Sequence, residues 1–246
     1  MRVTVLGACG AWPEADQACS GYLVERDGFR LLLDVGYATF PRLLRRLPAT
    51  ALDAVLVTHG HPDHCADLNP LLRARALAER PPPPLPVYAP RDALTAVLAL
   101  DRPGMLESAY RLREFTPGAA FRVGPFAVAT VDLPHHWPNA GYRLSAGGAV
   151  LAYTGDTGPS ERVVELGRDA EVLLAEATYP ERVPEPDAAF LTSAGDAARQ
   201  ATRAGARRLV LHHLWPGTPP EAALRAAAEH FAGPLAVARS DMVVDL

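Results

Sequence analysis

The 246-residue sequence has only three cysteines, no long apolar run and no excess of positive charge, and each of these features argues against one class of protein. Cys9, Cys19 and Cys65 are odd in number and lack C-x-x-C spacing, which argues against a disulfide framework and favours a reducing cytoplasm. No apolar segment approaches the roughly 18 residues that a membrane span requires. A strand pattern follows Met1 at once, without a leader. We therefore expect a soluble, cytoplasmic protein with no membrane partner.

The charge balance is slightly acidic, with 24 basic residues, all arginine, against 28 Asp and Glu and a net charge of −4. Such a chain has no overall attraction to a phosphate backbone, so a nucleic-acid partner is not expected. With 49% hydrophobic residues the chain can bury one large core, and we expect residues 1–246 to form a single domain. The sequence leaves open whether the protein forms a homodimer.

Short apolar runs bounded by glycine-containing turns predict strands in both halves of the chain. They lie at residues 2–6, 20–25, 29–33, 54–58, 87–89, 120–123, 126–131, 142–144 and 150–153. Helices are expected at 40–47, 66–80, 92–100 and 193–203, whereas residues 101–118 show no clear periodicity. Strands followed by helices in each half favour an α+β sandwich of two sheets with helices outside.

Four potential metal ligands occur within six residues, directly after the apolar run at 54–58: His59, His61, Asp63 and His64. In an extended loop His59 and His61 point to the same side, whereas the adjacent Asp63 and His64 diverge, which suits two metals better than one. Imidazole and carboxylate ligands favour Zn²⁺, with manganese or iron as alternatives. The competing interpretation is a polar loop whose histidines only cap backbone groups.

The H-x-H-x-D-H pattern after a hydrophobic strand, with Leu56-Val57-Thr58 before it and Asp67-Leu68 after it, resembles the metallo-β-lactamase-fold hydrolases. Within that superfamily the sequence is most similar to the ribonuclease Z and cyclic-nucleotide phosphodiesterase branch, and the resemblance covers almost the whole chain. It implies a four-layer αββα sandwich and a dinuclear metal site. Asp34 would lie beneath the metal loop; the sequence alone suggests that it caps the helix expected at 40–47, and the two interpretations are compatible.

Two further pairs of histidines, His135-His136 and His212-His213, also follow apolar strands. The residues alone leave the choice between His135 and His136 even. The resemblance selects His135 from its distance to the following proline and glycine. It selects His213 from its distance to the end of the apolar strand and to the following proline. His136 would then face the substrate or support a ligand.

Asp156 lies in the glycine-flanked segment Thr154-Gly155-Asp156-Thr157, where small neighbours allow the backbone to approach closely. A turn aspartate that bonds its own backbone would fit the sequence almost as well. The resemblance implies that Asp156 bridges two ions. The ligands expected for the first ion are His59, His61 and His135, and those for the second are Asp63, His64 and His213.

Glu176 resembles a glutamate that, in this branch, pairs with the histidine of an H-x-T motif to protonate the leaving group. In this chain the motif reads Phe190-Leu191-Thr192, and phenylalanine cannot transfer a proton. Asp63 is the other expected catalytic residue, because a ligand carboxylate can orient the attacking water or receive its proton.

These observations predict a hydrolase with two divalent ions, acting on a small phosphodiester such as a cyclic nucleotide. The chain lacks the long insertion with which ribonuclease Z proteins grip tRNA, which agrees with the acidic charge balance. The alternatives are a lactone or thioester hydrolase on the same site and a metal-holding binding protein with little turnover.

Overall fold

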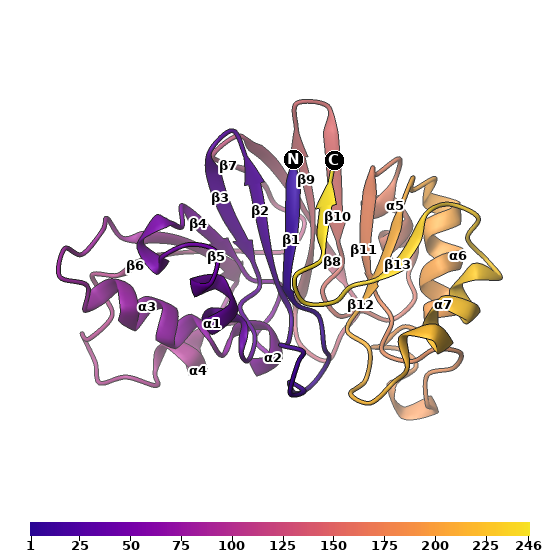
Figure 1. Ribbon diagram of the computed structural model, residues 1–246, viewed down its shortest axis with the longest axis horizontal. Coiled ribbons are helices and arrows are strands. Elements are labelled where there is room, and N and C mark those ends of the chain that lie inside the picture. The colour runs from indigo at the N-terminus through magenta and orange to yellow at the C-terminus, as the bar shows by residue number, and fades with distance from the viewer.

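The computed structural model describes residues 1–246 as two seven-stranded sheets that pack face to face, with helices on both outer sides (Figure 1). The first sheet has the order β14-β1-β2-β3-β4-β5-β6 and the second β13-β12-β11-β10-β9-β8-β7. In Figure 1, α1, α3 and α4 cover the first sheet and α5, α6 and α7 cover the second. The predicted αββα sandwich is therefore confirmed. No helix is both long and apolar enough to span a membrane.

The bounds of the elements follow the chain. The strands are β1 (Arg2–Gly7), β2 (Gly21–Arg26), β3 (Phe29–Leu33), β4 (Ala54–Leu56), β5 (Leu85–Pro90), β6 (Tyr110–Phe115), β7 (Ala120–Val123), β8 (Phe126–Leu133), β9 (Asn139–Ala146), β10 (Ala149–Tyr153), β11 (Val172–Glu176), β12 (Leu209–His212), β13 (Leu235–Val237) and β14 (Val243–Asp245). The helices are α1 (Thr39–Leu44), α2 (Pro62–Cys65), α3 (Leu68–Ala76), α4 (Thr95–Leu98), α5 (Glu161–Gly167), α6 (Ala194–Ala204) and α7 (Pro220–Ala228).

Each sheet buries both of its faces, so its central strands are apolar at consecutive positions. In β3, Leu31 and Leu33 enter the core between the two sheets, whereas Leu32 enters the core under α1 and α3. A third core lies between the second sheet and α5, α6 and α7. The period of two in strand side chains explains why one leucine run supplies two cores.

The site edge of the sandwich is defined by strand direction. β3, β4, β5 and β6 run parallel, as do β10, β11, β12 and β13. Antiparallel steps through β9 and β2 give β8 the direction of β10 and β1 the direction of β3. The carboxyl ends of β1, β4, β8, β10, β11 and β12 therefore lie at one edge, the lower edge in Figure 1.

Several predicted elements differ from the observed ones. The helix expected at 66–80 shortens to α3, which begins at Leu68 so that Pro70 falls in its first turn, where proline is tolerated; the separate short helix α2 precedes the predicted range. The helices expected at 40–47 and 92–100 shorten to α1 and α4. Strand β6 lies inside 101–118, and it is hard to recognise because this edge strand exposes Arg111, Arg113 and Glu114.

Candidate metal centre

The seven predicted metal ligands come from four separate loops, and all four loops leave carboxyl strand ends at the site edge. The loop after β4 carries His59 and His61, and α2, which follows it, carries Asp63 and His64; the segments after β8, β10 and β12 carry His135, Asp156 and His213. Their potential ligand atoms form two groups, and within each group all the atoms lie within 4.8 Å of one another. Asp156 belongs to both groups.

In the first group three imidazole rings face one another. His59 Nε2 lies 3.0 Å from His61 Nδ1, and His135 Nε2 lies 3.1 Å from the same atom. Asp156 Oδ2 completes the group at 3.7 Å from His59 Nε2 and 3.8 Å from His135 Nε2.

In the second group two histidines converge on two carboxylates. His213 Nε2 lies 3.1 Å from Asp63 Oδ2 and 3.2 Å from Asp156 Oδ2. His64 Nε2 lies 3.1 Å from Asp156 Oδ1, yet both atoms are buried without a hydrogen bond of normal geometry. A nitrogen and an oxygen this close without a hydrogen bond between them could both coordinate one ion.

The hydrogen bonds around the groups fix the tautomers of the histidines. His135 Nδ1 lies 3.0 Å from the carbonyl oxygen of Phe190, which can only accept, so this nitrogen carries the proton. Thr58 Oγ1 donates to Asp34 and therefore accepts from His59 Nδ1, 3.0 Å away. Each of these rings consequently turns a bare Nε2 lone pair toward the first group.

The same reasoning applies to the second group. Thr178 Oγ1 donates to Glu176 and accepts from His213 Nδ1 at 3.0 Å. His64 Nδ1 donates to Asp34 Oδ2 at 2.7 Å. Lone pairs and carboxylates that face one another repel unless protons or metal cations lie among them, and imidazole with carboxylate is a donor set for zinc and its first-row neighbours. The residues therefore fit a pair of divalent ions.

Asp34 supports the metal loop from below. Its carboxylate is fully buried and accepts hydrogen bonds from Thr58 N at 2.7 Å, Tyr153 Oη at 2.6 Å and His64 Nδ1 at 2.7 Å. The prediction that it lies beneath the loop is confirmed. The helix-cap alternative is wrong, because Ala38 precedes α1 and no side chain caps that helix.

The loops at the site edge pack too closely for larger side chains. A Cβ atom on Gly36 would fall 1.8 Å from the carbonyl oxygen of Asp63, and one on Gly10 would fall 2.8 Å from the ring of His213. His213 itself has a left-handed backbone, with φ of 61°. Backbone strain of this kind persists only where the surroundings hold it in place, as they do here.

The structure separates the members of each histidine pair. His136 is 43% exposed at its side chain and packs on the ring of Phe190, with centroids 4.2 Å apart. His212 is fully buried behind the groups, between Tyr22 and Tyr153. Neither belongs to the two groups, whereas His135 and His213 do.

Glu176 lies beside the second group, where its carboxylate accepts three hydrogen bonds. Its carboxylate accepts from Thr157 N at 2.7 Å, Thr192 N at 3.2 Å and the hydroxyl of Thr178. Burial, followed by the charge of Asp156, raises the pKa of Glu176 to about 8. Phe190 is half-buried in the same segment as Thr192, and its side chain supplies no proton donor.

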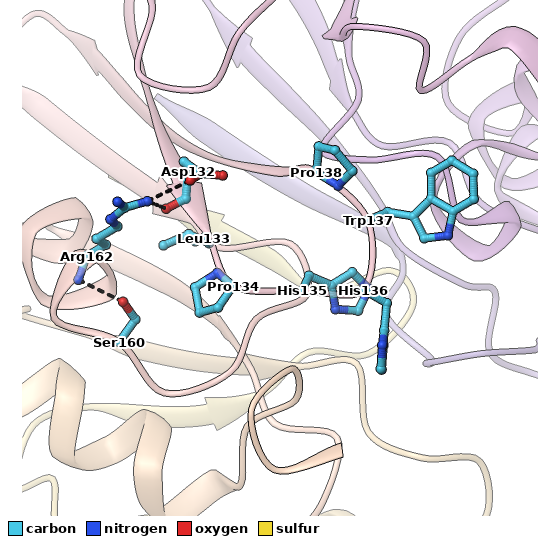
Figure 2. A pocket seen from close by; sticks show the side chains of 9 residues that line it. All are labelled: Asp132, Leu133, Pro134, His135, His136, Trp137, Pro138, Ser160 and Arg162. Atoms are coloured by element: carbon cyan, nitrogen blue, oxygen red, sulfur yellow. Dashed lines mark hydrogen bonds and ion pairs between the residues drawn. The ribbon is translucent and has the colours of Figure 1, made fainter. Parts of the chain in front are cut away.

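A hollow of about 490 Å³ is lined in part by the segment that carries His135. Figure 2 shows the lining residues, with Arg162 on one side and Trp137 on the other. Arg162 Nη1 donates to Asp132 Oδ2 at 2.7 Å and to the Asp132 carbonyl oxygen at 2.9 Å. The Nη1 end of the guanidinium is therefore already paired with Asp132.

Sequence reasoning missed several contributors to the site. Thr58 and Thr178 set the histidine tautomers, and the backbone N of Ala11 donates to Asp63 Oδ2 at 2.9 Å. The threonines carry a usable signal, because each lies within two residues of a predicted site residue. The Ala11 contact joins positions 52 residues apart and has no local signal.

The protonation of the metal-free protein predicts a specific pH dependence of stability. Burial alone would lower the pKa of His64 and of His213, but Asp156 and Asp63 outweigh it and raise both values. The stabilisation from these protonated rings is complete below the ordinary histidine pKa of about 6.5 and is lost as the pH rises through the raised values. Below about pH 6.5 the stability should instead fall as the pH falls. Burial lowers the pKa of His59 and brings that of His61 to about 4, so these rings take up protons more readily in the unfolded chain than in the folded protein.

We therefore expect the melting temperature of EDTA-treated protein to be highest near pH 6.5 and to fall between pH 6.5 and 8. Added Zn²⁺ should raise the melting temperature more at pH 8 than at pH 6, because the metal displaces protons from the same nitrogens. Differential scanning calorimetry across this range measures both trends. A metal-free melting temperature that rises toward pH 8 would contradict the assignment of protons to His64 and His213.

Comparisons with known proteins give one family. The model of the beta-lactamase superfamily domain matches residues 30–214. The chain is 30% identical to the probable metallo-hydrolase YhfI of Bacillus subtilis over 87% of each chain. The crystal structure of YhfI superimposes with a TM-score of 0.90 over 99% of each chain, at 28% identity.

A ribonuclease Z of Halobacterium salinarum is 28% identical over 87% of each chain. The crystal structure of human tRNase Z, short form, has a TM-score of 0.78 over 100% of this chain and 99% of its own, at 22% identity, which shows the shared fold alone. Taken with the His and Asp groups at the site edge, the matches establish that this chain belongs to the beta-lactamase superfamily and is a metallo-hydrolase of that fold.

Proposed function

We propose that the protein is a dinuclear phosphodiesterase that hydrolyses a small phosphodiester such as a cyclic nucleotide. The observation that carries the proposal is the pair of adjoining ligand groups with Asp156 in both. His59, His61 and His135 would hold one divalent ion, and Asp63, His64 and His213 the other. Two ions in this arrangement would supply an activated water and charge stabilisation for an in-line displacement at phosphorus. Zn²⁺ suits the ligands best, and Mn²⁺ or iron fits the same set.

The side chains of the site have distinct roles in this proposal. Asp63 is the residue that orients the attacking water or receives its proton, and its carboxylate is held in place by Ala11 N. His135 is held by the carbonyl oxygen of Phe190, so its ring cannot turn away from the first group. Asp34 orients His64 in the same way, and such supporting contacts usually matter almost as much as the ligands themselves.

The substrate class rests on the relatives and on the charge of the chain. The ribonuclease Z relative has a name that denotes phosphodiester chemistry. A net charge of −4 and the pairing of Arg162 with Asp132 leave no basic track beside the hollow for a nucleic-acid backbone. A small phosphodiester meets both conditions. We also propose that residues 1–246 act as one domain, because strands from both halves of the chain share the central core.

A substrate panel tests the proposed function. Purified protein with added Zn²⁺ or Mn²⁺ is assayed on bis-p-nitrophenyl phosphate, cyclic AMP, a homoserine lactone and a nitrocefin-type lactam. We expect turnover of the two phosphodiesters and none of the lactam. Turnover of the lactone alone would replace the proposal with a lactone or thioester hydrolase. Failure on the whole panel would favour a metal-holding protein with little turnover.

A further inference from the structure

All three tryptophans of the chain lie at the site edge, and all three are substantially exposed. Trp12, Trp137 and Trp215 expose 48%, 51% and 38% of their surface. Trp12 follows Ala11, which bonds Asp63; Trp215 lies two residues after His213; and Trp137 lies two residues after His135. Large apolar side chains that gather on an exposed surface usually mark a binding site.

Two of the tryptophans form a continuous wall with Tyr179, and we call these three residues the aromatic wall. The ring centroids of Trp12 and Trp215 lie 5.1 Å apart with an interplanar angle of 84°. The rings of Trp215 and Tyr179 are nearly parallel, at 12°, with centroids 6.1 Å apart. Trp137 is not part of the wall. Its ring lies next to that of His61 in the first group, with the ring centroids 6.2 Å apart.

The backbone ties the aromatic wall to the second ligand group. Trp215 N donates to the carbonyl oxygen of Thr178 at 3.0 Å, and the side chain of Thr178 bonds His213. Gly10 N donates to the carbonyl oxygen of Leu214 at 3.0 Å, which joins the loop of Trp12 to that of Trp215. The wall therefore has a fixed position relative to the ligand groups, as a substrate-binding surface requires.

The chemistry of the wall differs from that of the ligand groups beside it. Glu14 links the two tryptophan loops by accepting from Gly217 N at 2.9 Å, and Arg42 donates to the carbonyl oxygen of Asp16 in the loop that carries Trp12. The three side chains of the wall carry no charge, and a flat, uncharged ring can stack on indole and phenol faces. A molecule that suits both surfaces has a phosphoryl group at one end and an aromatic ring at the other.

We propose that Trp12, Tyr179 and Trp215 form a subsite for the base of a nucleotide whose phosphate occupies the ligand groups. The inference rests on the proposed function and names its substrate class more closely. Stacking on aromatic side chains recognises every base by its π face, so the subsite selects a nucleotide over a simple phosphodiester without reading the identity of the base.

The test compares two ligands that carry the same sugar phosphate, with and without a base. Binding of adenosine 5′-monophosphate and of ribose 5-phosphate to the metal-loaded protein is measured by isothermal titration calorimetry. We expect the nucleotide to bind at least about tenfold more tightly, the scale of base stacking on one aromatic side chain. In Trp12→Ala and Trp215→Ala this advantage should largely disappear, while the affinity for ribose 5-phosphate stays within about twofold.

Two control variants distinguish the loss of base stacking from a general disturbance of the folded protein. Trp215→Phe should keep most of the advantage because it keeps an aromatic face. Leu44→Ala, on α1, removes an apolar side chain with the same 48% exposure as Trp12 and should change neither affinity. Equal binding of the two ligands to the native protein would overturn the subsite, as would a Trp12→Ala variant that weakens both ligands equally.

Two outcomes distinguish this inference from the proposed function. Preferential nucleotide binding in a protein that hydrolyses no phosphodiester would leave the subsite standing and refute the proposed function. Hydrolysis of cyclic AMP with no contribution from the base would do the reverse. Light scattering on the Trp12→Ala/Trp215→Ala variant addresses a further possibility: a change from dimer to monomer with unchanged nucleotide affinity would make the wall an interface between copies and overturn the subsite.

Discussion

Replacement of Asp156 by alanine is expected to lower kcat/KM on a phosphodiester by more than about 100-fold. Loss of a residue that only supports a metal ligand already costs roughly 10- to 100-fold in metal affinity or activity, and Asp156 is the residue common to both groups. Its removal also leaves His64 Nε2 and His213 Nε2 without the carboxylate that lies 3.1 and 3.2 Å away. Both ions should therefore bind more weakly, and kcat should fall with metal content.

Two control variants distinguish the loss of a metal ligand from misfolding and from the loss of any nearby carboxylate. Asp156→Asn keeps the volume of the buried side chain but not its charge, and it should lose activity to a similar extent while keeping the native circular dichroism spectrum. Asp132→Ala removes an exposed aspartate at the rim of the neighbouring hollow and should change kcat/KM less than about twofold. A native rate in Asp156→Asn would mean that this carboxylate is not a shared ligand.

Replacement of Phe190 by histidine is expected to raise the rate on a substrate with a poor leaving group by at least about tenfold, the low end of general acid catalysis. Phe190 occupies the position of the donor histidine that the family resemblance implies, and its carbonyl oxygen already holds His135. An imidazole there would add a proton donor to the segment that contacts His135. The effect should depend on the leaving group, because an alkoxide needs a proton to depart and p-nitrophenolate does not.

The comparison uses cyclic AMP and bis-p-nitrophenyl phosphate as the two substrates. Phe190→Asn is the matched control, since it adds a polar side chain that can donate a hydrogen bond but does not transfer a proton near neutral pH. An equal response to both substrates, or an equal gain from asparagine, would show that position 190 affects packing or specificity and that the proton-donor argument fails. The contact of Phe190 with His136 makes a packing role the natural alternative.

The sequence predicts the architecture well because both sheets bury two faces. The resulting apolar runs, such as residues 31–33 and 209–211, are short and bounded by turns. It predicts helix ends less well, because Pro70 and the prolines at 81–84 compete with helix propensity in ways that depend on register. β6 escapes prediction because its alternating side chains are only half-buried.

For the site, the residues identify the ligand-rich segments but not which histidine of a pair turns inward. The backbone at His213 has φ of 61°, a turn that aims its ring at Asp63 and Asp156 and leaves His212 in the strand. No pattern in a single sequence indicates such a turn, and the family resemblance supplied that choice. The aromatic wall could not be predicted from the sequence either, because its residues lie on loops that are far apart in the chain and meet at the site edge.

The central claim is that seven residues form two adjoining metal sites around Asp156. Elemental analysis of the purified protein after exhaustive dialysis tests it most directly. We predict about two divalent ions per chain for the native protein, the content expected of a two-metal site. The folded His59→Ala/Asp156→Ala variant should lose most of that metal. Metal bound to this variant at the native stoichiometry would contradict the assignment of the site.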